Sequence, residues 1–489
     1  MKKSIAVNTV FNIAYNLLSI LFPLVTSSYL SHLLGPTYLG KVGYAQNIAS
    51  YFLVAASLGI PTYGTREIAK ISKDRALTNK VFSELFLLNL LSTIVCSAGY
   101  TTVIICASGF NSNIHLFLYV GLTLYMNVFN IDWFYKGNEK YVYITVRSFI
   151  IKILSLISIF LFVRKQEDYL KYALIVSLAQ TGNYVWNVIN LKGRVKLQFS
   201  SIGFKQHMKP ILILFATMIA SDLYNQVDVT MIGSIRTEAE VGYYSNGIKL
   251  IRIATSIATA ISATILPRLC TYFSEKKIID FENLFRKTMY YVVLFAAPAS
   301  LGMLLVSNDL VVVLFGNAFE PTAEVIKILC LLLFIVSISY LMGSVVLTAT
   351  NQEKRLLYAT ISGCLTNITL NALFIPKYGI NGAAVASICG EMAVLFVHYY
   401  YCKKVISGHL DKKELLTVIV SVFCMCMAVI GIKFMIASRV LRLIICIFSG
   451  VVTYVVVLWI TGNKSIREVF FKVKKRIKKR VSNYKSITP

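Results

Sequence analysis

Apolar residues along the chain gather in runs of about 20, separated by short segments rich in Gly, Pro, Lys and Arg. As an α-helix, such a run spans the roughly 30 Å of a bilayer's hydrocarbon core and satisfies its own backbone hydrogen bonds. A transmembrane barrel would instead show alternating segments of about 10 residues. We therefore expect an all-α polytopic membrane protein of about fourteen transmembrane helices. The approximate limits are 9–34, 42–63, 79–107, 114–135, 142–163, 169–191, 209–233, 241–266, 286–307, 324–348, 357–375, 380–403, 413–437 and 440–461.

The composition agrees with a bilayer environment. Of the 489 residues, 57% are hydrophobic and 15% are charged, and the mean hydropathy is +0.69. Two lysines precede the first run, but no small-residue cleavage site follows it, so we expect a signal-anchor span. The segments between runs are short, the longest outer loop being expected near Asn308–Ala323. Any activity is therefore expected among the helices.

Positive charge is unevenly distributed along the chain. The 49 Lys and Arg outnumber the 22 Asp and Glu, for a net charge of +27. If the N-terminus is inside, the segments that become cytoplasmic hold about 35 of these cations. The positive-inside rule then predicts that both termini are cytoplasmic, and it explains the net charge without nucleic acid.

The C-terminal segment 463–489 is expected to be a basic amphipathic cytoplasmic tail. Within Ser465–Lys485, apolar residues recur on one helical stripe and Lys and Arg occupy the other positions. A helix of this kind lies on the membrane surface and binds anionic lipids. Nucleic-acid binding is the weaker alternative, because a basic tail beside a membrane span is ordinary.

The chain shows a weak internal repeat. "LGKVGY" opens the second predicted span and "VGYYSN" opens the eighth, which matches Gly40 with Gly242. Pro61 and Pro267 end the two hairpins, and "GNEKY" and "NQEKR" join later spans at a similar separation. Six spans is an even number, so both copies enter the membrane in the same direction, as in a parallel repeat.

The repeat predicts two pseudo-symmetric six-helix lobes with two extra C-terminal helices, and a substrate path between the lobes. The predicted division is an N-lobe at 1–200, a C-lobe at 201–405, spans thirteen and fourteen at 406–462 and the tail at 463–489.

No motif for catalysis, cofactor binding or metal binding is found in the sequence. A Gly-rich phosphate loop is missing, so an ATP site is not expected. The five histidines and ten cysteines show no metal-ligand or redox spacing. We predict a secondary transporter and not an enzyme, with no catalytic residue, cofactor or metal.

Ionisable residues inside predicted spans carry the main functional signal. Arg252 lies about 16 Å into span eight at 1.5 Å per residue, with Lys249 one turn away on the same face. A charge at this depth costs at least about 2.5–3.5 kcal/mol unless it faces a partner or water. In span seven, Asp222 lies at the depth of Arg252, and Asp228 lies nearer that of Lys249. Two interpretations stay open: structural salt bridges within a hairpin, or cations that bind a diphosphate in a wet cavity with the aspartates as resting counter-ions.

Lys152 in span five and Glu391 in span twelve are also predicted to lie about halfway along their spans. Lys152 is a further candidate cation of the cavity, and Glu391 is a candidate coupling carboxylate.

Several stretches resemble Wzx-type flippases of lipid-linked oligosaccharides, in the MOP exporter superfamily. They are "ILFPLVTSSYLSHLLGPTYLGKVGYAQNIASYF", "LGIPTYGTREIAK", "FNIDWFYKGNEKYVYITVRSFIIKI", "DLYNQVDVTMIGSIRTEAEVGYYSNGIKLIRI" and "YGINGAAVAS". Together they cover most of the first twelve spans.

The resemblance implies a V-shaped, two-lobed fold with a cationic central cavity lined by the first, second, seventh and eighth spans. Arg66, Lys249 and Arg252 occupy matching stretches. The implied substrate is an undecaprenyl-diphosphate-linked oligosaccharide for capsule, exopolysaccharide or O-antigen, moved across a bacterial cytoplasmic membrane. A glycan polymerase is a candidate partner. The alternatives are lipid II as substrate, or an ion-coupled multidrug or small-molecule exporter that would use Glu391 or Asp222.

Overall fold

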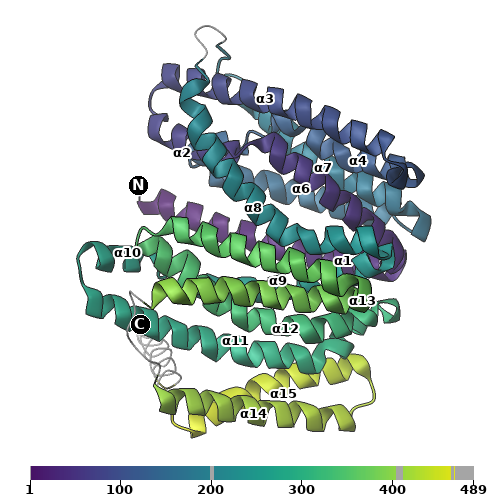
Figure 1. Ribbon diagram of the computed structural model, residues 1–489, viewed down its shortest axis with the longest axis vertical. Helices are drawn as coiled ribbons and strands as arrows, with labels where there is room; N and C mark the ends of the chain where they lie inside the picture. Colours follow the sequence, from purple (N-terminus) through teal and green to yellow (C-terminus); the bar gives the residue numbers. More distant parts are fainter. Residues whose placement is uncertain (1, 199–202, 404–410, 464–466, 468–489) are drawn as a thin grey trace, which may run out of the picture. The chain divides into compact units, whose positions relative to one another are not determined.

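The computed structural model describes residues 2–198, 203–403, 411–463 and 467 (Figure 1), and these carry helices and no strand. The first helices are α1 (Lys2–Ser57), α2 (Ile60–Ile71), α3 (Arg75–Cys106), α4 (Ile114–Tyr125), α5 (Asp132–Gly137), α6 (Tyr141–Phe162) and α7 (Tyr169–Leu191). They are followed by α8 (Lys205–Ile235), α9 (Glu238–Ala263), α10 (Leu266–Ser274), α11 (Ile278–Phe315), α12 (Pro321–Tyr340), α13 (Glu353–Cys402), α14 (Lys412–Met435) and α15 (Arg439–Ile460). Short 3-10 turns lie at Ser108–Asn113, Asn127–Phe129, Gln166–Asp168 and Asn317–Phe319, and a π-helix at Leu341–Leu347.

Two long helices each contain a pair of predicted spans. Gly35 (φ 71°, ψ 176°) kinks α1 between the first and second predicted spans. Gly379 (φ 55°, ψ −135°) kinks α13 between the eleventh and twelfth. Glycine adopts positive φ without a Cβ clash, so at both positions one residue interrupts the helical backbone where the sequence predicted a loop.

Two expectations about elements were wrong. The fourth predicted span is not continuous, because α4 ends at Tyr125 and α5 begins at Asp132, with a 3-10 turn between them. The predicted outer loop near Asn308–Ala323 is shorter, because the apolar face of α11 continues to Phe315 and Pro321 starts α12.

Nine helices in the described part of the chain are long and apolar enough to cross a membrane. The protein is therefore a multi-pass membrane protein. The predicted total of fourteen spans stays a prediction. The predicted amphipathic tail lies, Asn463 and Arg467 apart, outside the described residues.

The helices pack into two compact units, each with its own core. The first comprises residues 1–246 and 364–386, and the second residues 247–363 and 387–489. The predicted lobe boundaries at 200, 405 and 462 stay a prediction.

An aromatic cluster where α2, α3 and α5 meet anchors the first unit. Trp133 and Phe134 pack against Phe82, and the Phe82 and Trp133 rings have centroids 5.3 Å apart. Gly64 allows α2 to approach this cluster, because a Cβ there would lie 2.6 Å from the Trp133 ring. Fully buried aromatic side chains contribute several kcal/mol each, roughly 3–5 when truncated to Ala. This core supports the ends of α3, α6 and α8, where polar groups gather.

In the second unit α14 and α15 pack as a pair against α11 (Figure 1). Arg442 Nε donates to Asp309 Oδ2 at 2.8 Å, and Tyr454 donates its hydroxyl to the Leu294 carbonyl at 2.8 Å. These two hydrogen bonds attach α15 to α11 at two levels.

Candidate functional site

The predicted site residues are divided between the two units. The first unit holds Arg66, Lys152, Asp222 and Asp228, and the second holds Lys249, Arg252 and Glu391. Lys249 is partly buried and Arg252 is exposed, one turn apart on α9 as predicted. The pairing of Arg252 with Asp222 joins residues of different units and stays a prediction.

Arg66 and Lys152 both lie beside aromatic rings. The Arg66 side chain is 54% exposed on α2, its Nε is 3.4 Å from Glu67 Oε1 and its guanidinium is 5.6 Å from the Tyr63 ring centroid. The Lys152 ammonium on α6 is 5.8 Å from the Phe22 ring centroid. Cations at this distance from a ring gain roughly 0.5–2 kcal/mol. Their roles in substrate binding stay predictions.

Asp228 on α8 is 8% exposed and accepts hydrogen bonds from the side chains of Tyr244, Asn367 and Asn371. Tyr244 donates its hydroxyl to Oδ2 at 2.6 Å, and the side-chain amides of Asn367 and Asn371 donate to Oδ1 at 2.9 and 2.7 Å. Asn371 also donates to Asn367 Oδ1 at 3.0 Å, while its own Oδ1 is buried without a hydrogen-bond partner. A carboxylate beside an unpartnered amide oxygen is the kind of oxygen-rich site that suits a hard cation or a proton.

A set of buried polar contacts joins α1 to α8 and α9; we call it the polar seam. Asn47 Nδ2 donates to Thr230 Oγ1 at 2.6 Å and to the Gln226 carbonyl at 3.0 Å, and the Tyr51 and Thr230 hydroxyls are 2.7 Å apart. The Asn47 Oδ1 atom is buried and has no partner.

The seam also includes residues of α1 that precede the Gly35 kink. The hydroxyl of Ser27 donates to Asn246 Oδ1 at 3.0 Å, and Asn246 Nδ2 donates to Ser31 Oγ at 3.0 Å. Side-chain hydrogen bonds between membrane helices are worth only about 0.6–2 kcal/mol each. The seam is therefore closed by several individually weak contacts.

The repeat-matched glycines meet at one end of the seam. A Cβ added to Gly40 would overlap the carbonyl oxygen of Glu238 and would lie 3.0 Å from the Gly242 nitrogen. A Cβ added to Gly242 would overlap the carbonyl oxygen of Pro36. Only glycine allows these two backbones to approach so closely.

A buried hydrogen-bonded contact between Glu84 and His207 joins α3 to the start of α8. Glu84 is 1% exposed and His207 is 4% exposed, and His207 Nε2 lies 2.8 Å from Glu84 Oε2. Glu84 Oε1 accepts from the Gly203 amide at 2.8 Å, and the other ring nitrogen of His207 lies 2.8 Å from the Tyr63 hydroxyl.

Two further residues of α3 bind the segment that leads to α8. The amide of Lys196 donates to Asn79 Oδ1 at 3.0 Å, and the amide of Gln198 donates to Ser83 Oγ at 2.9 Å. The described parts of this linker are thus held along α3.

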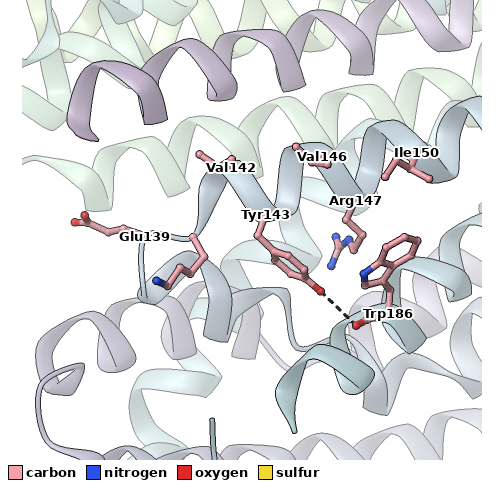
Figure 2. Close-up of a pocket in the computed structure, with 8 residues that line it drawn as sticks. Glu139, Val142, Tyr143, Val146, Arg147, Ile150 and Trp186 are labelled. Carbon is pink, nitrogen blue, oxygen red and sulfur yellow. Dashed lines mark hydrogen bonds between the residues drawn. The ribbon is translucent and has the colours of Figure 1, made fainter. Parts of the chain in front are cut away.

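Arg147 is a nearly buried cation on α6, 2% exposed, at a cavity of about 540 Å³ (Figure 2). Its Nη1 donates to Asp132 Oδ1 at 3.0 Å and also contacts Asn187 Oδ1. Asn187 Nδ2 in turn donates to Asp132 Oδ1 at 2.6 Å. The Arg147 Nε atom is buried without a partner. Asp132 and Asn187 thus hold the guanidinium while one donor remains available.

Sequence reasoning missed this second set of buried polar residues. Arg147 and Asp132 fall in neighbouring predicted spans, so their opposite charges were a usable signal. Glu84 is also a charge inside a predicted span. Asn367 and Asn371 carry no such signal, because uncharged amides in a membrane helix are common and only the fold shows that they meet Asp228.

The chain is similar to known proteins at modest sequence identity. A probable low-salt glycan biosynthesis flippase, Agl15 of Haloferax volcanii, is 26% identical over 52% of this chain and 53% of its own length. The chain thus spans about half the length of this relative. A putative O-antigen transporter of Escherichia coli K12 is 22% identical over 76% of this chain and 91% of its own length.

Comparison with solved structures shows the fold. The lipid II flippase MurJ, in an inward closed conformation, superposes with a TM-score of 0.80 at 15% identity, over 94% of this chain and 100% of that one. Residues 5–273, more than half of the chain, match the family described as "Polysaccharide biosynthesis protein". The chain therefore belongs to the polysaccharide biosynthesis protein family, and its resemblance to Wzx-type flippases is confirmed.

Proposed function

We propose that this protein moves undecaprenyl-diphosphate-linked oligosaccharide units across a bacterial cytoplasmic membrane, for capsule, exopolysaccharide or O-antigen synthesis. Membership of the family supports a role in polysaccharide biosynthesis, and the named relatives are a probable flippase and a putative O-antigen transporter. In this proposal the protein is a transporter and not an enzyme. The glycan headgroup crosses through the protein while the prenyl chain stays in lipid.

The polar seam is the main structural observation that supports the proposed transport mechanism. Two helix pairs that the internal repeat relates are joined inside a membrane protein by hydrogen bonds of Asn47, Tyr51, Thr230 and Asn246. Such side chains exchange protein partners for water or sugar hydroxyls at little net cost. If both termini are cytoplasmic, the contact between Gly40 and Gly242 lies at the outer end of the helices. We propose alternating access between a state in which this contact closes the outer end and a state in which the polar seam has separated.

Cationic side chains are proposed to bind the diphosphate. Lys249 and Arg252 share a face of α9 and present two positive charges one turn apart, and Arg66 and Lys152 are further cations of the proposed path. Arginine binds phosphate oxygens through its planar fork of N–H donors, and charge-assisted hydrogen bonds are about twice as strong as neutral ones. This chemistry suits a sugar diphosphate lipid.

Asp228 is proposed to couple transport to an ion gradient. Asp228 is buried where Tyr244 of α9 and Asn367 of α13 both bind it, so a proton or a small cation taken up there would change how α8 packs against α13. Asp222 and Glu391 remain the other coupling candidates. The same observation supports the second candidate function, an ion-coupled exporter of small molecules.

The test is transport by the purified full-length protein in vesicles. Undecaprenyl-diphosphate-linked oligosaccharide, lipid II and a cationic dye are supplied separately, and flipping is followed as protection of the sugar from an external glycosidase or as dye efflux. We expect flipping of the oligosaccharide lipid in the absence of ATP. Preference for lipid II, or dye efflux without lipid flipping, would replace the proposal by the corresponding alternative.

A further inference from the structure

Three segments between helices of the first unit converge on a cationic cavity of about 350 Å³. Its lining includes Lys73 between α2 and α3, Arg75 at the start of α3, Lys140 before α6 and Arg194 after α7. All four side chains are exposed, and Arg75 Nη2 donates to the Gly193 carbonyl at 3.0 Å, which ties the two ends of the cavity together. No carboxylate occurs among the described residues that line it. Four like charges held together attract an anion.

An apolar groove begins at the same lysine. Lys140 also lines the cavity of about 540 Å³ that runs along α6 (Figure 2). Val142, Val146 and Ile150 follow at intervals of four residues and form one stripe, and Trp186 of α7 lies on the opposite side. The stripe covers two helical turns, about 12 Å along the axis. The groove is therefore long and apolar enough for part of an acyl chain.

The buried guanidinium of Arg147 lies beside the aromatic side chains that line the groove. In Figure 2 the Arg147 guanidinium lies between Tyr143 and Trp186, and its Nε has no hydrogen-bond partner. Its charge is held by Asp132 at 3.0 Å, and it lies 5.7 Å from the Tyr143 ring centroid. Glu139, the carboxylate on this lining, points away from Arg147 (Figure 2). The lining thus places a buried guanidinium, one N–H of which has no hydrogen-bond partner, beside apolar side chains.

We propose that the two cavities form one binding site for an anionic phospholipid. The phosphodiester headgroup binds the four cations, and an acyl chain lies against the stripe on α6. The segments that supply Lys73, Arg75, Lys140 and Arg194 are all on the predicted cytoplasmic side, where anionic lipids are enriched. Basic pockets between membrane helices on this side bind such headgroups, and each cation near the surface contributes roughly fivefold in affinity.

A resident phospholipid fits the site better than the transported lipid does. The described lining of both cavities comes from α2, α3, α5, α6, α7 and their connections, and none of it comes from α1, α8 or α9. Those three helices carry the polar seam, and α9 carries Lys249 and Arg252, the cations proposed to bind the diphosphate. A lipid bound at α6 would instead brace the cytoplasmic end of the first unit.

Native mass spectrometry of the purified full-length protein in detergent tests the site. Phosphatidylglycerol is titrated against the parent protein and against the triple variant Lys73→Gln, Lys140→Gln and Arg194→Gln. The control removes the same charges at Lys136, Lys192 and Arg268, which are exposed and line neither cavity. We expect the first variant to bind phosphatidylglycerol at least about tenfold more weakly, and the control to bind like the parent. If both variants lost the same affinity for phosphatidylglycerol, the loss would be explained by general surface charge, and the proposed site would be overturned.

Two further probes separate the sources of phosphate. If inorganic phosphate binds as tightly as phosphatidylglycerol, the site is an anion site without a lipid groove. If farnesyl diphosphate binds more tightly, the site belongs to a prenyl diphosphate. Either result overturns the proposal.

The variant Val146→Trp fills the groove at a side chain that is 44% exposed and so tolerates the change. It should weaken phosphatidylglycerol binding and leave glycerol phosphate binding unchanged, and equal phosphatidylglycerol affinity would exclude the acyl-chain position.

Discussion

Gly40 and Gly242 contact each other through their backbones, and the internal repeat relates them as equivalent positions. The contact leaves no room for a Cβ, because one on Gly40 would overlap the Glu238 carbonyl. Gly43, one turn further along α1, differs: a Cβ there would have its nearest neighbours at 3.9 and 4.0 Å. The pair therefore provides a test with a built-in control.

Gly40→Ala should force α1 and α9 apart at this end of the polar seam. Overpacking of a tight contact costs about 1–3 kcal/mol, enough to shift a balance between closed and open states. We expect faster hydrogen–deuterium exchange in 236–246 for Gly40→Ala and unchanged exchange for Gly43→Ala. Equal exchange in the two variants would show that the contact does not hold the seam closed.

Asp228→Asn should abolish coupling while leaving the fold intact. An asparagine oxygen still accepts from Tyr244, but it cannot take up a proton or neutralise a cation. Transport in vesicles should then lose its dependence on a sodium or proton gradient. Tyr244→Phe, which removes the 2.6 Å hydrogen bond and keeps the carboxylate, should retain that dependence. Gradient-driven transport by Asp228→Asn would rule this residue out.

Arg252→Gln and its combination with Asp222→Asn separate the two interpretations of the charges in the seventh and eighth spans. If Arg252 binds the diphosphate, the single and double variants should both insert in the membrane and both fail to export glycan, because the charge is missing. Arg252→Lys keeps the charge without the fork and should be partly active. Surface glycan is measured beside the membrane level of each protein. Restored export in the double variant would mean that the pair is only structural.

Asp168, in the connection between α6 and α7, should make stability depend on acid pH. The Lys171 ammonium at 2.7 Å and the backbone amides of Arg164 and Lys165 hold the pKa of this carboxyl down to about 2, below its usual 3.8. A depressed pKa gives stability that is fully present above pH 3.8 and is lost as the pH falls toward 2. Asp168→Asn should therefore lower the melting temperature at pH 6 and have progressively less effect below pH 3.8. The exposed neighbour Glu167→Gln should show no such trend.

His207→Ala should destabilise the protein by leaving Glu84 buried with fewer partners. The loss of a hydrogen bond to a buried charged group costs about 1–3 kcal/mol or more. The apparent melting temperature in detergent should fall clearly, whereas Lys209→Ala, an exposed change on the same helix, should leave it unchanged. Equal melting temperatures for the two variants would show that the Glu84–His207 contact adds no stability.

The apolar runs predicted the class of fold because a bilayer imposes one length and one backbone solution on every span. The same rule could not predict that a single residue would kink a continuous helix. In the sequence, Gly35 and Gly379 lie in segments predicted as loops, and only their positive φ in the structure shows the kink. It also missed the break between Tyr125 and Asp132, because the apolar pattern continues across it.

For the candidate site, the charge of Asp228 inside a predicted span drew attention to a residue that is buried among polar groups, as the cost of a charge in lipid requires, and its role stays a prediction. Two of its partners, Asn367 and Asn371, lie more than 100 positions away on α13, and no local pattern connects them with Asp228. The polar seam was invisible for the same reason: Asn47, Tyr51 and Thr230 are ordinary residues of membrane helices until packing brings them together.

The segment between α7 and α8 has a mechanical consequence. Because Asn79, Ser83 and Glu84 hold its amides and Glu84 also binds His207, the first turn of α8 is attached to α3 on both sides of the connection. Because the Glu84 side chain binds both the Gly203 amide and His207, a tilt of α8 would pull directly on α3, and these two helix ends would move together.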